Sequence, residues 1–227
     1  MPQPRLSFSD GVAYSWLMAF GPYDAGSRFI GRAVELVDAS RSVPDLRESI
    51  RSDMRRLSIV MAVGAIDTYM HRLVLDRAYT HGELPGALAR LGVPFEWLLA
   101  QADQTKLAAR SKPRRSRPRV AVKRQLRDRL LRETFQRYEE VSGALGMAGR
   151  SGNWEAIGQQ MTPPMTPDQI GARLNEIVTR RNQIVHEGDY RRLERPRDSA
   201  RNAVSYTQAR RDIEFISALI DAIHAVV

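Results

Sequence analysis

Residues 166–189 read TPDQIGARLNEIVTRRNQIVHEGD, and this stretch has the clearest helix boundaries in the chain. Thr166 is a residue type that caps helix N-termini, and Pro167 is favoured at the first helical position. Gly188 is favoured just beyond a helix C-terminus, where the backbone turns left-handed. The pattern therefore predicts one helix from Pro167 to Glu187.

One face of this predicted helix is apolar. At about 100° of rotation per residue, it carries Ile170, Leu174, Ile177, Val178, Ile184 and Val185. Arg181 falls at the centre of the same face, where a guanidinium is costly unless it meets an anion or lines a cleft. Asn182 and His186 share one flank, four residues apart, so the amide can orient the imidazole. The alternative is that Arg181 pairs with a carboxylate of another helix and His186 is a surface or capping residue.

The rest of the chain is predicted to be helical, because strand patterns are weak throughout. We expect an irregular segment up to about residue 24, then a first helix over about 27–39 with Phe29 facing the core. Ser42 is expected to open a long, central helix that reaches about residue 78. Shorter helices are expected over about 95–102 and after Val120, and Ser205 begins a last helix that reaches the C-terminus. The fold class is therefore all-α, an antiparallel helical bundle.

The composition excludes several kinds of site. The 227 residues include no cysteine, which excludes disulfides, thiolate metal sites and a cysteine nucleophile. The four histidines are far apart and lack the spacing of a zinc enzyme. We expect no metal and no cofactor. A secretory signal and an uninterrupted apolar run of about 20 residues are both missing, so we expect a cytoplasmic protein without membrane contact.

The net charge of +9 comes from one segment. Residues 110–132 hold eleven Lys and Arg against one acid, so the remainder is close to neutral. Such a block attracts polyanions by releasing their counterions, and nucleic-acid contact is expected; the alternative is a solvated loop that only aids solubility. The candidate RNA-binding residues are Arg114, Arg115, Arg117, Arg119, Lys123, Arg124, Arg127, Arg191 and Arg192.

The run RNQIVHEGD, residues 181–189, resembles the RNxxxH motif of HEPN-domain proteins. It is most similar to the RiboL-PSP-HEPN branch, in which a comparable run ends the penultimate core helix. The resemblance covers mainly residues 44–78 and 167–227. Residues 80–160, which include the basic segment, are interpreted as an insertion within a single helical domain of residues 1–227.

The resemblance implies a metal-independent endoribonuclease that forms a homodimer, with two copies of the motif facing each other across a cleft. It makes Arg181 and His186 the catalytic pair and Asn182 a supporting residue. Asp67 of the long helix is expected to orient Arg181, unless it only pairs with His71 one turn away. The implied role is a toxin or anti-phage effector that acts on tRNA or other RNA and is restrained by an antitoxin or sensor protein.

Two other functions stay open. A non-catalytic HEPN module would hold a nucleotide or another protein, although the Arg-Asn-x3-His run is intact here. A basic regulator would bind duplex DNA through residues 110–132, although the chain has no helix-turn-helix, zinc or basic-zipper signature.

Overall fold

The computed structural model describes residues 20–80, 87, 90–91, 126–191 and 200–227. Within these ranges the chain is helical and contains no strand; its one bridge joins Tyr190 to Arg201. The predicted all-α class is confirmed. The named helices are α1 (Pro22–Ser42), α2 (Glu48–Thr80), α6 (Tyr138–Met147), α7 (Trp154–Gln160), α8 (Pro167–Glu187) and α9 (Tyr206–Val226).

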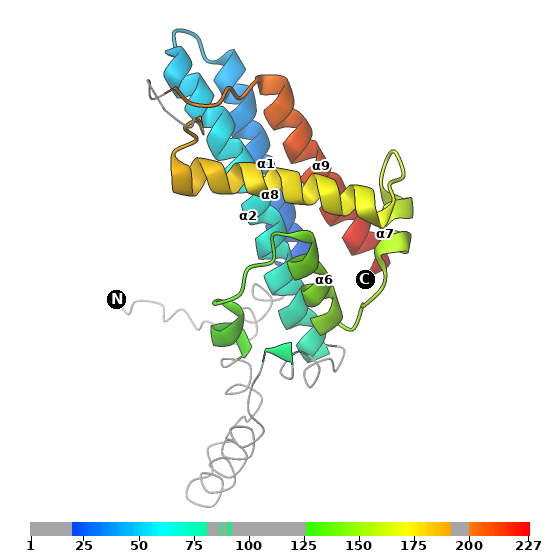
Figure 1. The fold of residues 1–227 in the computed structure, drawn as a ribbon. Helices are drawn as coiled ribbons and strands as arrows, with labels where there is room; N and C mark the ends of the chain where they lie inside the picture. The colour runs from blue at the N-terminus through cyan, green and yellow to red at the C-terminus, as the bar shows by residue number, and fades with distance from the viewer. Residues whose placement is uncertain (1–19, 81–86, 88–89, 92–125, 192–199) are drawn as a thin grey trace, which may run out of the picture.

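Helix α2 is the centre of the bundle. It packs against α1, α6, α8 and α9, and α8 crosses the group formed by α1, α2 and α9 (Figure 1). Much of the middle of α2 is buried because apolar residues face most directions there, among them Ile59, Ile66, Tyr69 and Met70, although Leu57 is 53% exposed. Part of α2 is also long and apolar enough to cross a membrane, but 56% of that stretch is buried in the bundle, as expected for a core helix.

The junction between α1 and α2 differs from the prediction. Ser42 is the last residue of α1, Asp45 adopts a left-handed conformation with a φ of 55°, and α2 begins only at Glu48. The guanidinium of Arg51 stabilises this turn by donating hydrogen bonds of 3.0 Å to the carbonyl oxygens of Ser40, Val43 and Leu46. Helix α1 also begins earlier than expected, at Pro22.

Several apolar side chains lie at the surface. Phe29 is 41% exposed and packs against Gly64 of α2, so its predicted core position is wrong. Val185, predicted on the buried face of α8, is 47% exposed. The last buried residue of α8 is Val178, and beyond it Ile184 is only partly buried against the core.

Candidate active site at the end of helix α8

Helix α8 has the two ends that its sequence predicts. The Thr166 hydroxyl accepts a hydrogen bond from the Gln169 amide at 3.3 Å, and the Gln169 side chain accepts one from the Thr166 amide at 2.9 Å. At the other end Gly188 has a φ of 64°, a conformation that suits glycine. The Thr166 cap fixes where the helix begins and the Gly188 cap fixes where it ends, and thus the position of its last turn.

Arg181 lies at the edge of the core and is partly buried, not enclosed at its centre as the helical geometry alone predicts. Its Nη1 donates to Asn182 Oδ1 at 2.9 Å. Its Nε is buried and has no hydrogen-bond partner among the described residues. No carboxylate in those ranges pairs with Arg181 either. Toward the described residues the guanidinium therefore keeps free donors for an anion, and the alternative of an internal ion pair is not found among them.

His186 is exposed in the last turn of α8. The predicted hydrogen bond between Asn182 and this imidazole is not found among the described residues; Asn182 Oδ1 instead accepts from Arg181. In the described part of the chain the His186 side chain makes no hydrogen bond. The structure thus brings Arg181 and Asn182 together and leaves His186 open to solvent.

Asp67 does not orient Arg181, and this prediction is wrong. Its carboxylate accepts hydrogen bonds from the Phe135 amide at 2.6 Å and from the Gln136 side chain at 3.4 Å. His71 lies beside it, with Nε2 2.8 Å from the Leu130 carbonyl oxygen. These two side chains of α2 hold the segment before α6 in place, which is a structural role.

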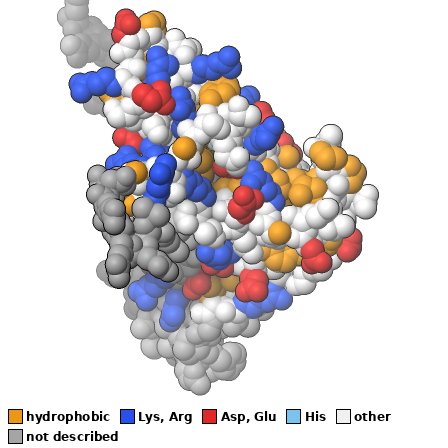
Figure 2. Space-filling model, turned by 45° about the horizontal axis from the view of Figure 1, so that its top comes forward, with side chains coloured by type: hydrophobic (Ala, Val, Ile, Leu, Met, Phe, Trp, Pro, Cys, Tyr) orange, Lys and Arg blue, Asp and Glu red, His pale blue; other side chains and the backbone are white. Residues whose placement is uncertain are grey.

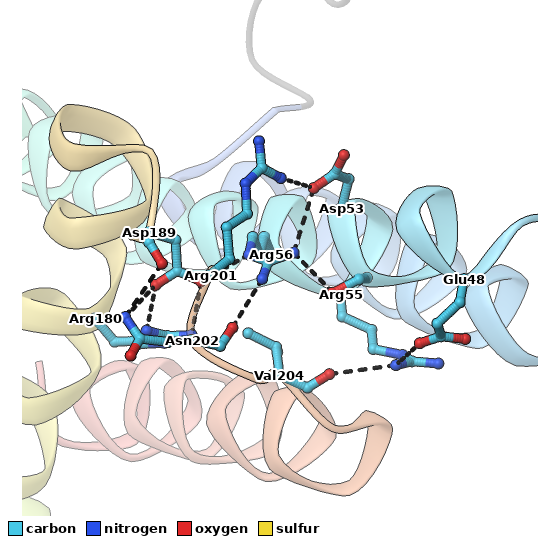
Figure 3. A network of polar contacts seen from close by, with 10 residues as sticks. Glu48, Asp53, Arg55, Arg56, Arg180, Asp189, Arg201, Asn202 and Val204 are labelled. Carbon is cyan, nitrogen blue, oxygen red and sulfur yellow. Dashed lines mark hydrogen bonds and ion pairs between the residues drawn. The ribbon is translucent and has the colours of Figure 1, made fainter. Parts of the chain in front are cut away.

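A residue without a predicted role, Asp189, holds the end of α8 to the rest of the bundle (Figure 3). It is fully buried and left-handed, with a φ of 61°. Its carboxylate accepts from Arg56 Nε at 2.7 Å and from both terminal nitrogens of Arg180, of which Nη2 lies at 2.8 Å. Asn202 donates to the same carboxylate at 3.2 Å.

The sequence does not point to Asp189, because its partner Arg56 is distant in the chain. Arg56 lies 133 positions away and belongs to another helix. The one local signal is an acid directly after the helix-ending glycine, nine residues beyond Arg180.

Most of the candidate RNA-binding residues lie outside the described ranges: Arg114, Arg115, Arg117, Arg119, Lys123, Arg124 and Arg192. Arg127 precedes the turn that leads to α6, and Arg191 is exposed just after the motif. On the face shown in Figure 2, basic and acidic side chains are interspersed over the described residues. This face therefore has no continuous basic field of its own.

A groove of about 530 Å³ lies on a different side of α8, toward α9. Arg173, Arg180, Gln183, Gln208 and Asp212 line it, whereas Arg181 and His186 do not. Burial raises the pKa of Asp212, although Arg173 beside it acts in the opposite direction. Within the described ranges no three His, Asp or Glu side chains are grouped so that they could hold a metal ion.

The crossing helices and the Arg181-Asn182 pair, followed by a histidine at an open helix end, define a helical bundle of the HEPN type. The RiboL-PSP-HEPN family model matches residues 27–227, which is most of the chain and includes residues 80–160. The chain belongs to this family. Searches of curated proteins and of solved structures gave no match.

Proposed function

We propose that this chain is a metal-independent endoribonuclease whose candidate catalytic residues are Arg181 and His186. The observation that carries the proposal is the state of Arg181. In a member of a HEPN family, this arginine is partly buried at the start of an intact motif, has no carboxylate partner in the described ranges, and keeps a buried Nε without an acceptor. Such a cation is stabilised when an anion binds.

The proposed reaction uses the RNA itself as the nucleophile. The 2′-OH loses its proton and attacks the adjacent phosphorus, the bond from phosphorus to the 5′-oxygen breaks, and that oxygen takes up a proton. The products are a 2′,3′-cyclic phosphate and a 5′-OH. His186 transfers a proton near neutral pH, while Arg181 binds the non-bridging oxygens and stabilises their charge in the transition state.

A homodimer suits this chemistry. A single imidazole has to serve as both base and acid, whereas two chains supply one imidazole for each proton transfer. The surface beside His186 supports a contact between copies, because Val185 is 47% exposed and Ile184 is only partly buried. In such a dimer the last turn of α8 lies close to the twofold axis.

We further propose that the protein acts in the cytoplasm as a toxin or anti-phage effector on tRNA or other cellular RNA. This role rests on family membership. An unrestrained ribonuclease damages its own cell, so an antitoxin or sensor protein is the expected partner.

The test is cleavage of total RNA by the purified full chain in the presence of a chelator, followed by analysis of the product ends. We expect cleavage with 2′,3′-cyclic phosphate and 5′-OH ends. Products with 3′-OH and 5′-phosphate ends would contradict the proposed chemistry. Stable binding of RNA, nucleotide or protein without cleavage would instead assign the chain to the non-catalytic HEPN modules.

A further inference from the structure

An exposed aromatic ring lies directly beyond the motif. Tyr190 is 49% exposed and follows the end of α8 by three residues. Its ring packs against the helix-ending glycine: Cε2 lies 2.9 Å from the position that a Cβ on Gly188 would take. Any side chain at Gly188 would collide with the ring, so the glycine both ends the helix and makes room for Tyr190. The ring is therefore held at the same helix end as His186.

The backbone of Tyr190 is held by several contacts, although its ring is exposed. Asp189, the preceding residue, is fully buried and bound to two arginines. Tyr190 forms an antiparallel bridge with Arg201, and its carbonyl accepts from the Asn202 side chain at 3.4 Å. These contacts fix the backbone that carries the ring, so contact with a ligand restricts mainly the two side-chain torsions of Tyr190.

Two arginines lie beside the ring. The Arg201 guanidinium lies over it, 6.0 Å from the ring centroid, and is held in place by Asp53. Arg191 is exposed at the next position, and no carboxylate in the described ranges pairs with it. An aromatic face beside cations is the combination that binds single-stranded nucleic acid, where bases stack and phosphates meet the charges.

We propose that Tyr190 is a stacking platform for one base of single-stranded RNA, at the helix end that carries His186. That this RNA is also the substrate rests on the proposed ribonuclease function, whereas the stacking itself does not. Since every base has a π-face, the platform orients the strand without selecting a sequence. Tyr190 is thus a substrate-binding residue and takes no part in proton transfer.

The test uses the full chain and a single-stranded oligonucleotide with 2′-O-methyl groups, which lacks the attacking hydroxyl, and one 2-aminopurine. We expect Tyr190→Ala to weaken binding about 5- to 140-fold, the range for one stacked base, and to abolish the quenching of 2-aminopurine. Tyr190→Trp and Tyr190→Phe should bind at least nearly as well as the wild type, because both keep a ring.

Tyr23→Ala is the matched control, because Tyr23 is 37% exposed but belongs to the start of α1, where its hydroxyl donates to Asp221. It should leave affinity and quenching unchanged. Unchanged affinity and quenching in Tyr190→Ala would overturn the proposal, as would a variant that alters only the oligomeric mass, because the ring would then be a contact between protein copies.

The same experiment separates this proposal from the proposed function. If the wild type never cleaves RNA, but its quenching of 2-aminopurine depends on Tyr190, the stacking proposal stands and the ribonuclease proposal fails. If the wild type cleaves RNA and Tyr190→Ala cleaves and binds RNA equally well, the ribonuclease proposal stands and the stacking proposal fails. If the chain does not bind the oligonucleotide, the stacking proposal fails.

Discussion

Two adjacent arginines of α8 have different environments, and one aspartate accounts for the difference. Asp189 folds back to bind Arg180, while the only side-chain partner of Arg181 among the described residues is the neutral Asn182. The sequence alone indicates Arg181 and His186, because a motif and a helical angle suffice for them. It does not indicate Asp189, because pairing with Arg56 depends on how α2 and α8 cross.

At the residue scale we predict that Asp189→Asn lowers the free energy of unfolding by about 3 kcal/mol, since two guanidiniums lose their buried counter-charge. Urea denaturation measures this change. Asp53→Asn is the matched control: Asp53 also binds Arg56, but its side chain is 49% exposed, so its loss should cost less than about 1 kcal/mol. Equal losses in the two variants would contradict the importance of burial at Asp189.

The bounds of a helix can be predicted where the residues that set them lie next to those bounds in the sequence. The bounds of α8 follow from Thr166, Pro167 and Gly188, which are all local, and the structure confirms them. The start of α2 was predicted wrongly, because its position depends on Arg51, a residue inside the helix that binds carbonyl oxygens behind it. The exposure of Val185 could not be predicted either, because helical periodicity does not say how far a neighbouring helix extends.

At the scale of the element we predict that Arg51→Ala loosens the α1–α2 turn. The variant leaves several carbonyl oxygens without their charged donor, and we expect a loss of about 2 kcal/mol in the free energy of unfolding. Thermal denaturation followed by circular dichroism measures this loss. Arg47→Ala removes an exposed arginine from the same turn and should unfold like the wild type; an identical transition for both variants would show that Arg51 does not stabilise the turn.

At the scale of the whole molecule, the bundle leaves the candidate site on its surface and not in an enclosed pocket. Arg181 is partly buried, His186 is exposed, and the groove beside α9 lies on another side of α8. A catalytic site on the surface excludes water only when another molecule covers it. This geometry, more than the fold class, favours a site completed by a second copy of the chain.

The corresponding prediction concerns the oligomeric state of the protein in solution. We expect the wild type to sediment as a dimer of the 25.7 kDa chain, and Val185→Glu to sediment as a monomer, because a carboxylate would be buried without a partner at the contact. Leu131→Glu is the control, since Leu131 is 69% exposed but precedes α6, away from the motif. Dimerisation unaffected by Val185→Glu would place the contact elsewhere.

The most direct measurement is the rate of RNA cleavage in chelator by Arg181→Ala and His186→Ala, beside Arg211→Ala as an exposed arginine of α9. If Arg181 holds the phosphate and His186 moves the proton, both variants keep the helical circular dichroism spectrum and lose cleavage at least about 100-fold, while Arg211→Ala cleaves like the wild type. Folded variants at Arg181 and His186 that retain wild-type cleavage would contradict this account.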